Sequence, residues 1–186
     1  MIVGICGKSG SGKTTLAEKL IHNDKNISVI HLDIDKIGHQ TLEIENVKEE
    51  LIACFGDSIV QDGKIYRPNL SKIAFSSSAA MEKLTDITWK YMKKSIDSFL
   101  SESSNSIIIL DWALLPKTEY FAKCDMTVLL DVPYEVRKQR VISRDSISDS
   151  LFDLRESASL DYCFRDFDIV DSDIEDIFER LVKFYE

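Results

Sequence analysis

The chain has 186 residues, 44% of them hydrophobic, and a formal net charge of −9 at pH 7. This length suits one large domain or a domain with an insertion, and the composition is ordinary for a soluble globular protein. The negative charge argues against general nucleic-acid binding, which needs a basic surface. No apolar run approaches the roughly 20 residues of a membrane span, and the first residues do not form a signal peptide. We therefore expect a cytoplasmic protein without nucleic-acid or membrane partners.

The chain begins with a strand, a glycine-rich loop and a helix. The apolar run at residues 2–6 is typical of a short buried strand, and residues 15–21 are typical of a helix. The eight residues between them read GKSGSGKT and fit the phosphate-loop pattern G-x-x-x-x-G-K-[ST] without a mismatch. A glycine- and serine-rich turn could match by chance. The position between a strand and a helix favours a nucleotide-binding loop.

The chemistry of such a loop explains its residue types. Glycines let the backbone curl so that successive N–H groups point inward, and the following helix adds the positive end of its dipole. Lys13 can reach the β- and γ-phosphates, and the Thr14 hydroxyl can bind Mg²⁺. The expected nucleotide contacts are Gly7, Lys8, Ser9, Gly10, Ser11, Gly12, Lys13, Thr14 and Thr15.

Further apolar runs predict a parallel sheet. They occupy residues 27–32, 106–110, 126–132 and 168–170, and they are mainly apolar without a regular apolar–polar alternation, as in strands that are covered on both faces. Helical segments separate them, so the predicted fold class is α/β with a parallel β-sheet core covered by helices. Residues 41–103 contain no convincing strand. This stretch is either a helical insertion that binds an acceptor or a set of helices that simply covers the sheet.

Carboxylates follow several of the predicted strands. In open α/β sheets, ligands bind beyond the carboxyl ends of the strands, where Asp33, Asp35 and Asp111 are expected together with the phosphate loop. One carboxylate can accept the proton of an attacking hydroxyl, and another can support the Mg²⁺ shell. Asp33 and Asp35 would share a face if both lay on a strand. Alternatively, one of them caps a helix that starts near Lys36.

Three arginines are spaced to share one face of a predicted helix. Arg137, Arg140 and Arg144 follow an i, i+3, i+7 pattern in a chain that is otherwise acidic. Guanidinium groups can neutralise a transferring phosphoryl group, and a mobile segment that carries them can exclude water. Ordinary ion pairs with neighbouring carboxylates are the alternative. We favour the first interpretation for Arg140 and Arg144 and leave Arg137 open between the two.

The order of these motifs resembles that of the dephospho-coenzyme A kinases over nearly the whole chain. Residues 30–39, IHLDIDKIGH, resemble the D-x-D stretch of that family. Residues 62–70, DGKIYRPNL, resemble its D-G-x-[IL]-D-R-x-x-L segment. Residues 132–133 and 139–145 are similar to its lid region.

The resemblance implies an activity, namely ATP plus dephospho-coenzyme A giving ADP plus coenzyme A with Mg²⁺. It implies a nucleotide-binding core at residues 1–40 and 104–186 with a lid around 134–155, and an acceptor-binding insertion at 41–103. No sequence pattern indicates an oligomer, so a monomer is the default expectation. Asp33 would be the base for the ribose 3′-hydroxyl, and Arg140 and Arg144 would lie near the nucleotide. The expected roles are catalysis by Asp33, Lys13 and Arg140, acceptor binding by Asp33, Asp35, His39, Arg67 and Asp111, and metal binding by Thr14.

The departures from the family pattern cluster where the acceptor should bind. Tyr66 replaces an aspartate, Trp89-Lys90 replaces a His-Pro pair, and residues 113–117 replace a P-L-L-F-E segment. Two alternatives therefore stay open: a kinase for another small acceptor, such as a nucleoside or nucleoside monophosphate, and a nucleotide-binding regulator without catalysis. A GTPase is disfavoured, because residues 122–125, AKCD, lack the asparagine of the guanine-binding motif and precede a strand.

Overall fold

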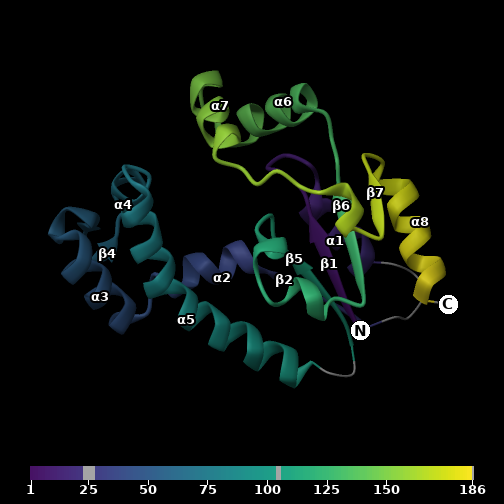
Figure 1. Ribbon diagram of the computed structural model, residues 1–186, viewed down its shortest axis with the longest axis horizontal. Coiled ribbons are helices and arrows are strands. Elements are labelled where there is room, and N and C mark those ends of the chain that lie inside the picture. Colours follow the sequence, from purple (N-terminus) through teal and green to yellow (C-terminus); the bar gives the residue numbers. More distant parts are fainter. Residues whose placement is uncertain (23–27, 104–105, 186) are drawn as a thin grey trace. The chain divides into compact units, whose positions relative to one another are not determined.

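The computed structural model describes residues 1–22, 28–103 and 106–185, and these divide into two compact units (Figure 1). One unit combines Met1–Asp33 with Ser103–Glu186, and the other is the continuous stretch Ile34–Glu102. The second unit begins at residue 34 and not at the expected residue 41, because α2 (Ile34–Thr41) packs against α5 (Ser78–Glu102).

The first unit is built on a five-stranded sheet in which every neighbouring pair is parallel. The strand order is β2-β5-β1-β6-β7, so the first strand lies in the middle. The strands are β1 (Ile2–Cys6), β2 (Val29–Asp33), β5 (Ile107–Asp111), β6 (Met126–Leu130) and β7 (Ile169–Asp171). This confirms the α/β class predicted from the apolar runs. Ile27, expected in the second strand, lies outside the described residues.

Two helices pack against each other and against the core residues of this sheet. They are α1 (Lys13–Ile21) and α8 (Ile174–Tyr185). Leu16 and Leu20 of α1 are fully buried, as are Ile177 and Leu181 of α8. Each such side chain contributes about 1.5–3 kcal/mol when it leaves water. The helix that follows the phosphate loop is therefore held by a packed core.

The remaining elements of the first unit follow β5 and β6. The short turns η2 (Leu115–Lys117) and η3 (Phe121–Lys123) come after β5, and η4 (Phe164–Asp166) precedes β7. After β6 come α6 (Tyr134–Asp145) and α7 (Asp149–Ser157), which pack against each other. Phe152 of α7 is fully buried and makes an edge-to-face contact with Tyr134 of α6, with ring centroids 5.6 Å apart. These two helices make up the segment that was predicted as a lid.

The second unit is helical and has its own core. Besides α2 and α5 it contains α3 (Glu45–Phe55), the short turn η1 (Asp57–Ile59) and α4 (Arg67–Ala74). Its core comprises Val47, Leu51, Ile59, Ile65 and Leu70. Leu84, Ile87 and Tyr91 of α5 pack against this cluster. No proline interrupts α5, which runs for 25 residues.

The expectation that residues 41–103 contain no strand was wrong in one place. A small antiparallel hairpin is formed by β3 (Val60–Gln61) and β4 (Lys64–Ile65). Its turn residues, Asp62 and Gly63, have φ angles of 52° and 75°. Positive φ at both positions is typical of the tight turns that join hairpin strands. Strands of two residues are too short to leave a periodic pattern in the sequence.

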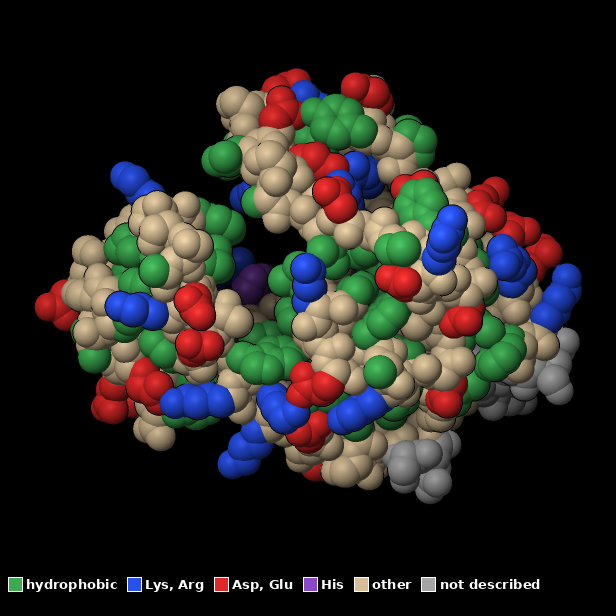
Figure 2. Space-filling view, in the orientation of Figure 1, with side chains coloured by type: hydrophobic (Ala, Val, Ile, Leu, Met, Phe, Trp, Pro, Cys, Tyr) green, Lys and Arg blue, Asp and Glu red, His purple; other side chains and the backbone are tan. Residues whose placement is uncertain are grey.

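Within the part of the chain that the structure describes, no helix is both long enough and apolar enough to cross a membrane. On the face seen in Figure 2, lysine and arginine side chains lie among aspartate and glutamate side chains.

Candidate active site

The phosphate loop joins β1 to α1 in a conformation that needs its glycines. Gly7, Gly10 and Gly12 have φ angles of 149°, 81° and 100°, a region that other residues rarely adopt. A Cβ atom on Gly10 would lie only 2.7 Å from the Arg137 carbonyl oxygen of α6. The loop therefore curls tightly and lies directly against α6.

Lys13 begins α1, and its side chain folds back over the loop. Its Nζ atom donates a hydrogen bond to the Gly7 carbonyl oxygen across 3.0 Å. The first N–H groups of a helix have no partner within the helix, so this end of α1 attracts anions. An ammonium group and several N–H donors are thus gathered at the same turn. This arrangement suits the phosphates of a nucleotide.

The next residue, Thr14, connects the loop to the neighbouring strand. Its hydroxyl donates to Asp111 Oδ2 across 3.1 Å, and His31 Nε2 lies 3.3 Å from the same oxygen. Asp111 ends β5, and only 4% of its surface is exposed. A hydroxyl and a carboxylate are the oxygen ligands that Mg²⁺ prefers, and Mg²⁺ usually takes its other ligands from water and phosphate. The pair of Thr14 and Asp111 therefore fits a magnesium ion that is bound with a nucleotide.

The described residues offer no group of three or more His, Cys, Asp and Glu side chains placed to hold a metal. An ion that is bound through phosphate oxygens and one or two protein ligands does not require such a cage.

Asp33 ends β2 beside Asp111. The two residues are paired across the β2–β5 ladder, and the side chain of Asp33 is partly exposed. The carboxyl ends of β1, β5 and β2 thus present the loop, Asp111 and Asp33 in neighbouring positions. Asp35 does not lie on this strand. Because the helix α2 begins at Ile34, Asp35 falls in its first turn, and the expectation of a strand face shared with Asp33 was wrong.

The three arginines of α6 differ in their contacts. Arg140 Nη1 donates to the carbonyl oxygens of Gly10 and Ser11, at 3.2 and 3.5 Å, so it lies over the phosphate loop. Arg144 instead forms two hydrogen bonds with Asp145, at 2.7 and 3.0 Å, and its side chain is exposed. Arg137 is buried and binds Glu156 of α7. The structure brings Arg140 to the loop and does not bring Arg144 there.

Comparison with known proteins decides the family. A family model described as dephospho-CoA kinase matches residues 1–162. The chain belongs to the dephospho-CoA kinase family. It is 30% identical to a dephospho-CoA kinase of Fusobacterium nucleatum over 192 aligned positions, covering 100% of this chain and 97% of that protein. A dephospho-CoA kinase of Aquifex aeolicus is 29% identical, with 99% and 95% of the two chains covered.

Solved structures show the same fold. A crystal structure from Thermus thermophilus superposes with a TM-score of 0.80 at 25% identity, covering 98% of this chain and 96% of that one. A dephospho-CoA kinase from Campylobacter jejuni superposes with a TM-score of 0.57 at 20% identity, covering 99% and 95%. Dephospho-CoA kinases and this chain thus share the α/β core.

Two residues predicted to bind the acceptor meet within the helical unit. Arg67, at the start of α4, donates from Nη2 to the Nε2 atom of His39 in α2 across 2.7 Å. Both side chains are largely exposed, so the guanidinium group keeps further donors for a ligand. Tyr66, which stands where the dephospho-CoA kinase pattern has an aspartate, directly precedes α4.

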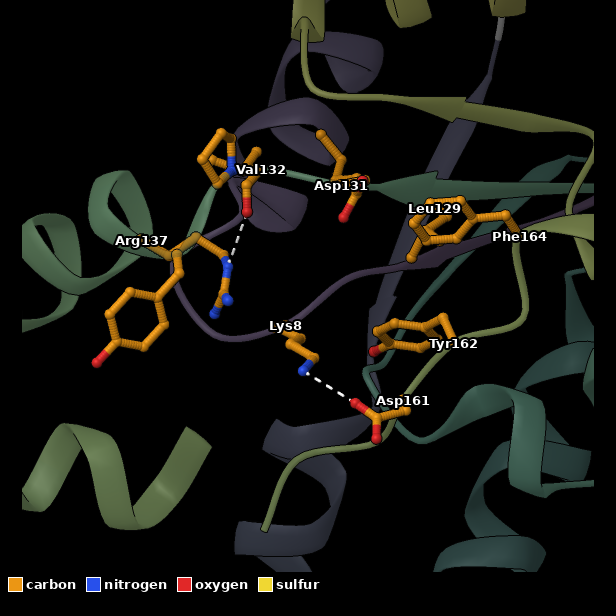
Figure 3. Close-up of a pocket in the computed structure, with 11 residues that line it drawn as sticks. Lys8, Leu129, Asp131, Val132, Arg137, Asp161, Tyr162 and Phe164 are labelled. Atoms are coloured by element: carbon orange, nitrogen blue, oxygen red, sulfur yellow. Dashed lines mark hydrogen bonds and ion pairs between the residues drawn. The ribbon is translucent and has the colours of Figure 1, made fainter. Parts of the chain in front are cut away.

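A cavity of about 270 Å³ beside the phosphate loop was not predicted from the sequence (Figure 3). Lys8 Nζ of the loop lies 3.3 Å from Asp161 Oδ1, and Tyr162 and Phe164 also line the cavity.

Glu156 binds both Lys8 and Arg137, and the sequence did not predict this contact either. The Arg137 guanidinium holds the pKa of the Glu156 carboxyl below its usual range, with a smaller contribution from Lys8. No short motif in the sequence marks these contacts, because they join segments that are far apart along the chain.

Cys6, the last residue of β1, lies directly before the loop and is fully buried. Burial raises the pKa of its thiol far above the ordinary value, and burial also raises the pKa of the Cys124 thiol to about 12. Both thiols therefore stay protonated at neutral pH and act as small apolar side chains.

Proposed function

We propose that this protein transfers the γ-phosphate of ATP to the 3′-hydroxyl of the ribose of dephospho-coenzyme A, which forms ADP and coenzyme A in the last step of coenzyme A synthesis. One observation carries the proposal: Lys13 and the Thr14–Asp111 pair stand at the same sheet edge as Asp33, in a chain of the dephospho-CoA kinase family. The proposed binding site for ATP and the proposed base for the acceptor hydroxyl thus lie at the same edge of the sheet.

The loop binds the triphosphate of ATP. Its N–H groups and those at the start of α1 donate to phosphate oxygens, and Lys13 exchanges its contact with the Gly7 carbonyl for the β- and γ-phosphates. Arg140, which already lies over Gly10 and Ser11, neutralises charge that develops on the transferring group. Arg144 reaches the nucleotide after it leaves Asp145.

Asp33 acts as the general base. Its carboxylate accepts the proton of the 3′-hydroxyl while the oxygen–phosphorus bond to the acceptor forms and the bond from the γ-phosphorus to the bridging oxygen of ADP breaks. The support is its position at the end of β2, in register with Asp111 of β5. A partly exposed carboxylate at this place is accessible to an alcohol.

Thr14 holds the magnesium ion, and Asp111 supports it directly or through water. The ion, when bound, neutralises charge on the β- and γ-phosphate oxygens. His31 and the Thr14 hydroxyl both contact Asp111 Oδ2 and fix the orientation of this carboxylate.

The helical unit binds the acceptor. Arg67, held by His39, offers a guanidinium group to the acceptor phosphates, which it can bind in a bidentate manner. Asp35 adds an exposed carboxylate in the first turn of α2. We further propose that the protein acts in the cytoplasm as a monomer, with small-molecule substrates and without nucleic-acid or membrane partners.

A panel of acceptors tests this function. Purified protein with ATP and Mg²⁺ is assayed for ADP release with dephospho-coenzyme A, uridine, cytidine, CMP and AMP. Release that depends on dephospho-coenzyme A alone supports the proposal. A preference for a nucleoside or nucleoside monophosphate would assign another acceptor, and ATP binding without any acceptor-dependent turnover would identify a regulator.

A further inference from the structure

One carboxylate of α7 connects three segments of the first unit. Glu156 accepts two hydrogen bonds from Arg137 of α6, with Nη1–Oε2 at 2.8 Å and Nη2–Oε1 at 2.7 Å. The same Oε1 atom lies 3.3 Å from Lys8 Nζ, at the second position of the phosphate loop. Glu156 thus binds a cation of α6 and a cation of the loop at once.

The cations in turn contact the backbone around the loop. Arg137 Nη1 donates to the Ser9 carbonyl oxygen at 3.4 Å, and its Nε atom donates to the Val132 carbonyl oxygen at 2.9 Å (the latter drawn in Figure 3). The Arg137 carbonyl oxygen is the atom that a side chain on Gly10 would strike. Lys8 and Ser9 of the loop therefore bind Glu156 and Arg137, and the next residue, Gly10, has room beside the Arg137 backbone only because it lacks a side chain.

The network is shielded from water. The exposed fractions of the Arg137 and Glu156 side chains are 6% and 17%. Charges in such places interact more strongly than surface charges do, and removal of one partner leaves the other without compensation. The lowered pKa of Glu156 agrees with a carboxylate that stays ionised between two cations.

We propose that Glu156 is a positioning residue of the phosphate loop, which acts through Arg137 and Lys8 to hold residues 8–10 in the conformation that binds the triphosphate. This inference rests on the proposed ATP binding and is independent of the acceptor. Because the loop contacts the phosphates in the ground state and in the transition state alike, loss of Glu156 weakens ATP binding more than it slows turnover.

The same two helices provide a matched control. Asp153 of α7 pairs with Lys138 of α6 at 3.1 Å, as Glu156 pairs with Arg137. Among the described residues, the hydrogen bonds and ion pairs of Asp153 and Lys138 stay within α6 and α7. Asp153→Asn weakens the connection between α6 and α7 and leaves the loop contacts in place. A role of Glu156 in helix packing alone would lower the thermal midpoint and leave ATP binding and loop exchange as they are in Asp153→Asn.

The experiment compares wild type, Glu156→Gln, Asp153→Asn and the double variant Arg137→Gln/Glu156→Gln, which removes both buried charges together. Measurements are the Kd for ATP by calorimetry, the thermal midpoint, kcat, and deuterium uptake of the nucleotide-free loop peptide. Glu156→Gln is expected to raise the Kd for ATP about tenfold, which corresponds to a moderate interaction energy between contacting charges. It is also expected to speed amide hydrogen exchange in the loop. Asp153→Asn is expected to change neither quantity.

The double variant separates positioning from stability. If its thermal midpoint returns toward that of wild type while the Kd stays raised and loop exchange stays fast, the positioning role is supported. Recovery of the Kd together with the midpoint, or an equal rise in Kd for Asp153→Asn, would overturn it. A wild-type protein that failed to bind ATP would overturn the proposed function and this inference with it, whereas unchanged binding by Glu156→Gln would overturn only the inference.

Discussion

The Thr14 hydroxyl donates a hydrogen bond to Asp111 Oδ2 across 3.1 Å, which joins the last residue of the phosphate loop to the end of the adjacent strand. The two residues are far apart along the chain and meet because β1 and β5 are parallel neighbours. His31, from the strand on the other side of β5, approaches the same oxygen at 3.3 Å. The Asp111 carboxylate is therefore buried and is contacted by Thr14 on one side and by His31 on the other.

Substitution Asp111→Asn is expected to weaken the response to Mg²⁺. The amide keeps the size of the side chain but loses the charge that supports a cation, so the Mg²⁺ concentration for half-maximal activity rises and kcat/KM falls by roughly 10- to 100-fold. Titration of activity with Mg²⁺, together with calorimetric binding of ATP with and without Mg²⁺, measures the effect.

Asp168 provides a matched control for this substitution. Its carboxylate accepts hydrogen bonds from both the backbone N–H and the hydroxyl of Thr127, so it is a second threonine–aspartate pair in the same unit. Asp168→Asn is expected to lower thermal stability without changing the Mg²⁺ dependence. A similar Mg²⁺ response in the two variants would contradict the role assigned to Asp111.

Substitution Asp33→Asn is expected to separate binding from chemistry. The amide cannot accept the proton of the acceptor hydroxyl, so kcat falls by roughly 10²- to 10⁴-fold, the usual contribution of a general base. The Kd for ATP stays close to that of wild type, because Asp33 does not bind the phosphates of ATP in the proposed mechanism. Steady-state kinetics and calorimetry on one preparation measure both quantities, and unchanged turnover would remove the base role.

Arg67→Ala is expected to impair the acceptor site selectively. Loss of hydrogen bonds from a charged group should raise the KM for dephospho-coenzyme A by roughly 10- to 100-fold and leave the KM for ATP unchanged. Lys72→Ala, an exposed cation on the same helix, is the control and should change neither constant. If both variants raised the two constants together, α4 would have no specific part in acceptor binding.

The stability that Glu156 supplies is expected to depend on pH. Its pKa in the folded protein lies below the ordinary value of 4.5, chiefly because Arg137 donates hydrogen bonds to it. A lowered folded pKa stabilises the protein above the unfolded pKa, and this contribution is lost as the pH falls through the folded value. The free energy of unfolding of wild type should exceed that of Glu156→Gln by up to about 3 kcal/mol at neutral pH.

Urea unfolding of both proteins across the acid range measures this difference. The gap should narrow continuously below about pH 4.5, where Glu156 becomes protonated in the unfolded chain. A gap that stayed constant down to strong acid would show that the carboxylate charge does not stabilise the fold.

The sequence predicts the core of the fold well because the patterns that indicate it are local. Uninterrupted apolar runs predict β1 with its observed bounds of residues 2–6, and the glycine pattern identifies the loop before α1. The position rule for parallel sheets then places Asp33 and Asp111 at the same edge, where the structure has them in register. Each inference needs only neighbouring residues and a general property of parallel sheets.

The contacts that remain hidden join distant segments or depend on short elements. Lys8, Arg137 and Glu156 are individually ordinary charged residues, and only the packing of α7 on α6 brings them together. His31 reaches Asp111 because β2 pairs with β5 and not with β1. The place of Asp35 depends on one residue, the start of α2 at Ile34, and sequence patterns locate helix ends only to within a few residues.

The most direct test of the central claim is the identity of the phosphorylated product. Wild-type protein is incubated with ATP, Mg²⁺ and dephospho-coenzyme A, and the products are resolved by liquid chromatography and ³¹P NMR. Equal amounts of ADP and coenzyme A are expected, with the new phosphate on the 3′-oxygen of the ribose, and Asp33→Asn should form this product roughly 10²- to 10⁴-fold more slowly. Phosphate on another atom, or ADP released without any phosphorylated acceptor, would contradict the claim.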